Sequence, residues 1–243
     1  MQLQKVIERI SPSYKKYFSK KIFLMKLYAY IKGWRTVTYY SDCLRKSNHY
    51  SVFLPNNGIS LKKAIIALHG SKGSIYEYVP TLLSKYAESE NLIIVCPDSA
   101  GYKFFESEGE QIVLEVLKHI KNYYSINENN VYILGNSMGG RGAGFIGLRN
   151  SQLFAGIVCI YGTITESDYD LLKKAVKKNP IFIAHGTEDK IIPLSESEAL
   201  IKMLSRLSFQ YSFKIIDGLG HDLKVFDLSL PSIMHFLKSL SKS

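Results

Sequence analysis

The segment Gly135-Asn136-Ser137-Met138-Gly139-Gly140 is the most informative part of this chain, because a predicted strand precedes it and a predicted helix follows it. Residues 130–134 are a short apolar, β-branched run bounded by polar residues, which predicts a buried β-strand. Residues 141–148 are mostly small or apolar and are expected to form the helix. Gly-x-Ser-x-Gly at such a junction is typical of a nucleophile elbow, a sharp turn that raises the serine hydroxyl above the sheet. An ordinary glycine-rich turn has the same pattern, so the rest of the sequence must decide.

Short apolar strands alternate with helical stretches on both sides of this segment. The expected strands are 36–40, 50–54, 64–68, 92–96, 130–134, 155–161, 181–184 and 211–216. Helices are expected at 78–89 and at 111–124, where the apolar residues have amphipathic spacing. This alternation predicts an α/β fold with a mostly parallel sheet of about eight strands and helices on both faces. In such sheets, functional side chains gather in the loops at the carboxyl ends of the strands.

Two of these loops carry the partners that a reactive serine needs. The loop after the strand at 181–184 contains Asp189, and the loop after the last strand contains His221. A serine hydroxyl is a poor nucleophile near neutral pH, so an imidazole must accept its proton and a carboxylate must orient that imidazole. The chain order Ser…Asp…His is the one that accompanies a nucleophile elbow. The sequence therefore predicts Ser137 as nucleophile, Asp189 as acid and His221 as base.

Other residues compete for the roles of base and acid. His185 also ends a predicted strand, but His221 follows the last strand and has glycines beside it, which favours His221 as the base. Glu188 and Asp222 are alternatives to Asp189, although either also fits a solvated charge on a loop.

The loop His69-Gly70-Ser71-Lys72-Gly73 follows an earlier strand and predicts the remaining part of such a site. The backbone N–H groups of Ser71 and Met138 are expected to form an oxyanion hole. One such donor contributes roughly 3–4 kcal/mol in a site that excludes water. We expect His69 to hydrogen-bond this loop in place, not to take part in the chemistry.

With these segments in this order, the chain resembles the α/β-hydrolase superfamily. It is most similar to the small esterases grouped with feruloyl esterases, esterase D, polyhydroxybutyrate depolymerases and phospholipase/carboxylesterase enzymes. The matching segments are residues 50–55, 68–71, 95–98, 135–140, 185–189 and 220–221. The resemblance implies a serine hydrolase that cleaves carboxylic esters through an acyl-enzyme, with no metal or organic cofactor. It implies the same roles for Ser137, Asp189, His221 and the backbone of Ser71 and Met138.

The short connection between the strands at 155–161 and 181 bears on the substrate. It has only about 20 residues, so a large lid domain is not expected at the place where a lid usually lies. Four aromatic residues follow strand ends and are predicted either to line a substrate pocket or to anchor their loops: Tyr76, Tyr102, Phe105 and Tyr161. An open site of this kind favours small-molecule or glycan-linked esters with short acyl, acetyl-sugar or feruloyl groups.

Two other functions remain as alternatives. A peptidase of the prolyl-oligopeptidase type is disfavoured because no propeller or gating domain is apparent in the sequence. A non-catalytic binding protein with this fold is disfavoured by the complete set of serine, acid and histidine.

The positive charge is concentrated at the N-terminus. The chain has a net charge of +10, and residues 1–46 hold 11 Lys and Arg against two acids. Basic and aromatic residues together predict a helical N-terminal extension over 1–33, ahead of a catalytic domain over 34–243. The extension either binds an anionic membrane surface or an acidic partner, or packs on the domain with its charges in water. No nucleic-acid-binding motif is recognisable, so nucleic acid is not an expected partner.

Two further features bear on localisation. Lys26 interrupts the apolar residues 22–31, which are fewer than the ~20 that a spanning helix needs, and no cleavage site for a secretory signal follows. Cys96 and Cys159 lie in apolar strands and are expected to be free, buried thiols, which favours a reducing compartment. The expectation is a cytoplasmic protein that either stays in solution or binds peripherally to a membrane.

Overall fold

The computed structural model describes residues 30, 33–55, 62–78, 81–162, 164–165, 168–176 and 178–241. The extension predicted for 1–33 therefore lies outside the described residues, apart from Tyr30 and Gly33. Among the helices that are described, none combines the length and the apolar character needed to cross a membrane.

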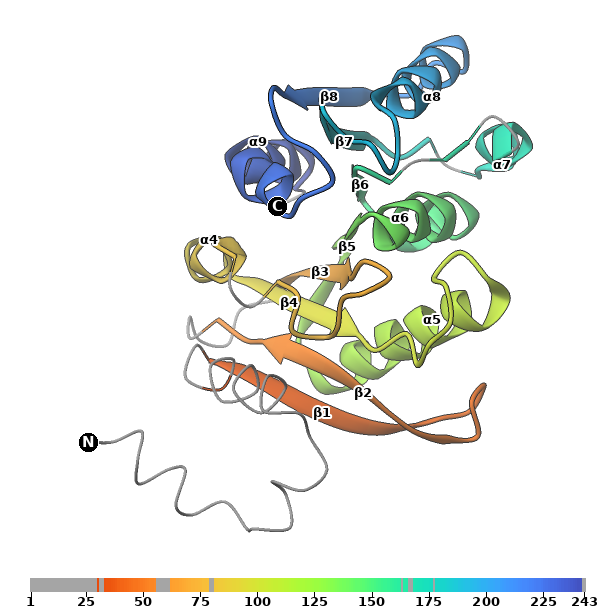
Figure 1. Cartoon of the computed structure of the whole chain (residues 1–243). Coiled ribbons are helices and arrows are strands. Elements are labelled where there is room, and N and C mark those ends of the chain that lie inside the picture. The colour runs from red at the N-terminus through yellow and green to blue at the C-terminus, as the bar shows by residue number, and fades with distance from the viewer. Residues whose placement is uncertain are drawn as a thin grey trace.

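In the described residues, one eight-stranded sheet runs through the centre of the molecule (Figure 1). The strands are β1 (Trp34–Ser41), β2 (Lys46–Phe53), β3 (Lys62–Leu68), β4 (Leu92–Pro97), β5 (Ile126–Asn136), β6 (Gly156–Ile160), β7 (Ile181–Gly186) and β8 (Tyr211–Ile216). Their order across the sheet is β1-β2-β4-β3-β5-β6-β7-β8. The β1–β2 and β2–β4 pairs are antiparallel, and the other neighbouring pairs are parallel. The predicted mostly parallel sheet is confirmed.

Helices cover both faces of this sheet, as predicted (Figure 1). Helices α4 (Leu83–Glu90) and α9 (Lys224–Leu240) lie on one face, where their apolar side chains join a core with Tyr78 and Tyr132. Helices α5 (Ser107–Tyr123), α6 (Met138–Arg149) and α8 (Leu194–Arg206) cover the other face and a second core. The fully buried strands β4, β6 and β7 are near-continuously apolar because they have a helix layer on either side.

The parallel strands place the predicted loops at one edge of the sheet. In the register of the central strands, Leu68 at the end of β3 pairs with Gly135 of β5, and Gly135 pairs with Cys159 of β6. The carboxyl ends of these strands therefore lie side by side, and the loops that follow them meet above the same edge.

The observed bounds differ most from the predicted ones at the helix after β3 and at strand β5. The helix expected from Tyr78 begins only at Leu83, because Tyr78 is a fully buried anchor whose hydroxyl lies 2.9 Å from the carbonyl oxygen of Leu68. The strand expected at 130–134 extends in both directions as β5. Between β6 and β7, the helix in the described residues is the six-residue α7 (Tyr169–Lys174), and no large lid is present there.

Candidate active site

Ser137 is the single residue between strand β5 and helix α6, and its backbone is strained. Its φ is +53°, a left-handed value that a residue with a side chain seldom adopts. Two glycines make this turn possible. A Cβ on Gly139 would lie 2.0 Å from the carbonyl oxygen of Leu68, and one on Gly135 would lie 2.1 Å from that of Gly139. Only residues without a Cβ let the helix approach the sheet this closely, as in a nucleophile elbow.

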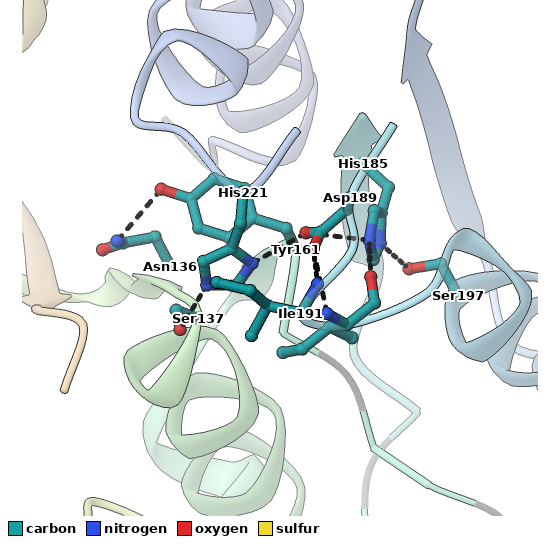
Figure 2. A network of polar contacts seen from close by, with 9 residues as sticks. Asn136, Ser137, Tyr161, His185, Asp189, Ile191, Ser197 and His221 are labelled. Atoms are coloured by element: carbon teal, nitrogen blue, oxygen red, sulfur yellow. Dashed lines mark hydrogen bonds and ion pairs between the residues drawn. The ribbon is translucent and has the colours of Figure 1, made fainter. Parts of the chain in front are cut away.

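The side chains of Ser137, His221 and Asp189 form a continuous hydrogen-bonded chain (Figure 2). His221 Nδ1 lies 2.7 Å from Asp189 Oδ2, and His221 Nε2 lies 2.8 Å from Ser137 Oγ. A carboxylate only accepts, so the imidazole proton lies on Nδ1 and Nε2 is left to accept the proton of the Ser137 hydroxyl. The structure thus brings together the three residues that the sequence singled out.

Backbone groups hold the Asp189 carboxylate in place. The N–H groups of Ile191 and Ile192 each donate to Oδ1 at 2.9 Å, which leaves Oδ2 for the imidazole. Burial alone would raise the pKa of Asp189, but the N–H of Ile192, the His221 imidazole and the N–H of Ile191 together lower it below its usual value. The carboxylate therefore stays ionised at neutral and mildly acidic pH.

The structure separates the competing residues from the serine. Glu188 is exposed, and the exposed Asp222 accepts a hydrogen bond from the backbone N–H of Lys224. His185 is fully buried, and its imidazole lies between the side chains of Asp189 and Ser197 (Figure 2). Its Nε2 lies 2.8 Å from the carbonyl oxygen of Ile192 and 3.4 Å from Asp189 Oδ2, and its Nδ1 lies 2.7 Å from Ser197 Oγ.

These contacts make His185 a brace for the loop that carries Asp189. The carbonyl oxygen of Ile192 can only accept, so the His185 proton lies on Nε2 and Nδ1 accepts from the Ser197 hydroxyl. Sequence reasoning considered His185 only as a rival base. The signal in the sequence is its place directly after the apolar run 181–184, which predicts a buried strand; in the structure His185 is fully buried.

The variant His185→Ala is expected to lower both activity and stability. It leaves the Ile192 carbonyl and the Ser197 hydroxyl without their partner, which costs about 2–3 kcal/mol of unfolding free energy. A loosened Asp189 loop is expected to lower kcat by about 10- to 100-fold with little change in KM. Urea unfolding and steady-state kinetics measure the two effects. Ser197→Ala is the matched control, because it keeps the Ile192 contact; an equal loss of kcat in that variant would contradict the bracing role.

Tyr161, expected either to line a substrate pocket or to anchor its loop, packs against His221 (Figure 2). Its ring packs at a steep angle against the His221 imidazole, with centroids 4.6 Å apart, and only 2% of the residue is exposed. The Tyr161 hydroxyl accepts from Nδ2 of the Asn136 side chain at 3.1 Å. Oδ1 of the same side chain accepts from the Tyr78 hydroxyl at 2.6 Å. Tyr161 therefore supports the His221 imidazole, and its hydrogen bond joins it to Asn136, the residue that precedes Ser137.

The loop after β3 approaches the serine from the other side. The His69 Nδ1–H donates to the carbonyl oxygen of Gly70 at 2.7 Å, which agrees with the expected structural role of His69. The N–H of Gly70 donates to Glu77 Oε1 at 3.0 Å, so the next N–H along the loop, that of Ser71, is the candidate oxyanion donor. Met138 is the first residue of α6, so its N–H has no acceptor within the helix.

A cavity of about 660 Å³ opens beside the serine. Its lining includes Ser71, Ser137 and Met138 together with Phe105, one of the four predicted substrate-binding aromatics. The other three predicted aromatics, Tyr76, Tyr102 and Tyr161, are not among the described residues that line this cavity. Tyr76 is buried, and its hydroxyl lies 2.8 Å from the Thr36 hydroxyl on β1. Tyr102 is 37% exposed outside the cavity.

Sequence reasoning also missed the cluster that supports Phe105. Arg141, one helical turn after Ser137, pairs with Asp168 at 2.9 Å, and its guanidinium lies 4.9 Å from the centre of the Phe105 ring. Arg141 lies four residues after Ser137, in the first turn of α6, so the sequence already places its side chain near the serine.

No metal centre accompanies this site in the described parts of the chain, where no three His, Cys, Asp or Glu side chains are grouped to hold an ion.

The comparison of the sequence with known families and proteins gives three results. The profile of the phospholipase/carboxylesterase family matches residues 98–241. Over 156 residues the chain is 27% identical to the bifunctional acetylxylan esterase/xylanase XynS20E of Neocallimastix patriciarum, covering 62% of this chain and 23% of that protein. Over 119 residues it is 29% identical to carboxylesterase SOBER1 of Arabidopsis thaliana, covering 44% of this chain and 52% of that protein. The chain thus spans about half or less of the length of these relatives.

The structure is similar to that of the S-formylglutathione hydrolase FrmB from Staphylococcus aureus. The TM-score is 0.74 at 19% sequence identity, and the match covers 84% of this chain and 98% of that one. At this identity the likeness shows the fold, which is the α/β-hydrolase fold expected from the sequence.

Proposed function

Because the chain belongs to the phospholipase/carboxylesterase family, we propose that it hydrolyses carboxylic esters through an acyl-enzyme formed on Ser137. The observation that carries this proposal is the hydrogen-bonded chain from Ser137 through His221 to Asp189, with distances of 2.8 and 2.7 Å. The names of the two relatives, an acetylxylan esterase and a carboxylesterase, support ester hydrolysis.

In the proposed first half-reaction, Ser137 Oγ attacks the carbonyl carbon of the ester while its proton passes to His221 Nε2. The carbonyl oxygen becomes an oxyanion in the tetrahedral intermediate. The intermediate then collapses, the bond to the alcohol oxygen breaks, and that oxygen takes the proton from His221. The acyl group remains on Ser137 as an ester.

In the second half-reaction, a water molecule attacks the acyl-enzyme and gives a proton to His221 Nε2. A second tetrahedral intermediate collapses to the carboxylic acid and the free serine, which takes its proton back from the imidazole. Asp189 stays ionised throughout and stabilises the imidazolium in both steps. The N–H groups of Ser71 and Met138 donate to the oxyanion in both intermediates.

The proposed substrates are small-molecule or glycan-linked esters. The acetylxylan esterase among the relatives supports an ester on a sugar, and the carboxylesterase supports a simple ester. The absence of a large lid from the described residues between β6 and β7 leaves the site open to substrates of both kinds.

Hydrolysis of 4-nitrophenyl butyrate by the purified chain tests this proposal. The expected result is turnover with a burst of one equivalent of nitrophenol when deacylation is slower than acylation. Peptide 4-nitroanilides serve as the comparison. Cleavage of the anilides at a rate comparable with that of the ester would favour the peptidase alternative, and no cleavage of either would reject a hydrolase.

We further propose that residues 34–243 are the catalytic domain and that the basic segment before them binds an anionic surface. Residues 1–33 hold eight Lys and Arg against one acid, which favours anionic lipid headgroups. We expect the full chain to sediment with vesicles rich in phosphatidylserine at low salt, and to be released at high salt. A chain without residues 1–33 is expected to keep its esterase activity and lose the sedimentation; equal sedimentation of both chains would contradict the proposal.

A further inference from the structure

The position of the cavity beside Ser137 shows which half of a bound ester, the acyl group or the alcohol, it can hold. Its lining includes the nucleophile and both residues whose N–H groups are the candidate oxyanion donors. His221 is not one of the described residues that line this cavity. The leaving alcohol must take its proton from His221 and therefore lies on the imidazole side of the carbonyl carbon. The cavity is then left for the acyl group.

This cavity is much larger than an acetyl group requires. Its volume of about 660 Å³ lies in the range of roughly 300–1,000 Å³ that encloses most of a drug-sized ligand. Much of its wall is apolar and comes from the side chains of Phe105, Met138, Ile191, Ile192 and Pro193. Ile191 is 72% exposed, and an apolar side chain so open to solvent beside the nucleophile is available to cover a bound apolar group.

Three charged side chains in the described part of the chain line the cavity. The two basic ones are paired with acids outside it, and the third is itself an acid. Arg141 pairs with Asp168 at 2.9 Å, and Lys103 pairs with Glu106 at 3.1 Å. Glu196, in the first turn of α8, also lines the cavity and would repel a negative group. The cavity therefore suits an uncharged acyl group.

Phe105 is held in a fixed position in this wall. The Arg141 guanidinium lies 4.9 Å from the centre of its ring and the Lys103 ammonium 5.8 Å, both within the range of a cation–π contact. Arg141 is on α6, and its partner Asp168 lies in the connection between β6 and α7. The position of the Phe105 ring is therefore fixed by these two elements as well as by its own loop. A ring held in this way presents a constant surface to a bound group.

We propose, on the basis of the function proposed above, that this cavity is the acyl pocket and that it selects a bulky, uncharged, apolar acyl group over acetyl. Phe105 is the residue that determines this selection. An aromatic acyl group of benzoyl size or larger fits best, because it fills the apolar wall and packs against the Phe105 ring.

A series of 4-nitrophenyl esters with acetyl, butyryl, hexanoyl and benzoyl groups tests this inference on the full chain. The leaving group is the same throughout, and each kcat/KM is divided by the rate constant for alkaline hydrolysis of the same ester. Each buried methylene contributes a factor of about four, so the corrected kcat/KM for benzoyl should exceed that for acetyl at least tenfold. A corrected value for acetyl equal to or above that for benzoyl would overturn the inference.

Variants of two aromatic residues on one loop show whether Phe105 determines the preference for benzoyl over acetyl. Phe105→Ala should lower the benzoyl-to-acetyl ratio about tenfold, and Phe105→Leu should lower it less. Tyr102→Ala, on the same loop but outside the cavity, should leave the ratio within twofold of that of the wild-type chain. An equal ratio in Phe105→Ala and the wild-type chain would overturn the role of Phe105. If Phe105→Ala does not fold, Phe105→Leu decides.

Labelling with a small fluorophosphonate separates this inference from the proposed function. A labelled chain that prefers acetyl esters retains the proposed serine hydrolase and loses only the acyl pocket. A folded chain that neither labels nor cleaves any ester of the series contradicts the proposed function, and the inference falls with it.

Discussion

Ser137→Ala is expected to lower kcat for ester hydrolysis by about 10⁶-fold, the largest effect of any single substitution in this chain. Without the hydroxyl there is no atom to form the acyl-enzyme, and the hydrogen bond of 2.8 Å to His221 is lost with it. Alanine has the same backbone strain as serine at a φ of +53°, so the fold is expected to persist.

Steady-state hydrolysis of 4-nitrophenyl butyrate, together with circular dichroism and thermal unfolding, measures this effect. Ser195→Ala, an exposed position on α8 outside the site, is the matched control and should keep activity within twofold of the wild-type chain. Activity above one thousandth of the wild-type value in folded Ser137→Ala would place the nucleophile elsewhere.

Asp189→Asn is expected to lower kcat by about 10⁴-fold at neutral pH. An amide has an N–H₂ group that can donate to His221 Nδ1, which would favour the imidazole tautomer with its proton on Nε2. That tautomer cannot accept the proton of Ser137. The amide also carries no charge to stabilise the imidazolium, so both the orientation and the charge of the base are lost.

The controls for Asp189→Asn are the two rival acids, Glu188→Gln and Asp222→Asn, each expected to keep activity within threefold of the wild-type chain. Comparison of kcat across the three variants at pH 7.5 is the measurement. A loss in either control as large as that in Asp189→Asn would identify a different acid.

The lowered pKa of Asp189 also predicts a contribution to stability with a defined pH dependence. Its pKa is lower in the folded than in the unfolded chain, so the ionised carboxylate stabilises the fold at pH values above its unfolded pKa of about 4. This stabilisation is lost as the pH falls through the folded pKa. The unfolding free energy of Asp189→Asn should therefore fall less between neutral and acidic pH than that of the wild-type chain, as urea unfolding at a series of pH values would measure.

The sheet was predictable because its signal is local. Each buried strand, such as 64–68 or 181–184, is a continuous apolar run, and the loops that follow these strands must meet at one edge. That is why Ser137, Asp189 and His221, which lie far apart in the sequence, were expected to lie close together. The hydrogen bonds of 2.7 and 2.8 Å between their side chains agree with this expectation.

The surroundings of the site were less predictable, because the direction of a loop side chain depends on the whole fold. Tyr76 and Tyr161 both follow strands on the correct side of the sheet, yet Tyr76 is directed toward β1 and Tyr161 packs against His221. The start of α4 was placed too early for the same reason: nothing local in the sequence shows that Tyr78 anchors to Leu68 and Asn136.

Covalent labelling shows whether Ser137 is a nucleophile activated by His221. The full chain and its His221→Ala variant are treated with a fluorophosphonate, digested, and the modified peptide is identified by mass spectrometry. We expect one adduct, on Ser137, in the wild-type chain, and labelling slower by at least a thousandfold in folded His221→Ala. An adduct on another serine, or equally fast labelling of both proteins, would contradict this role of Ser137.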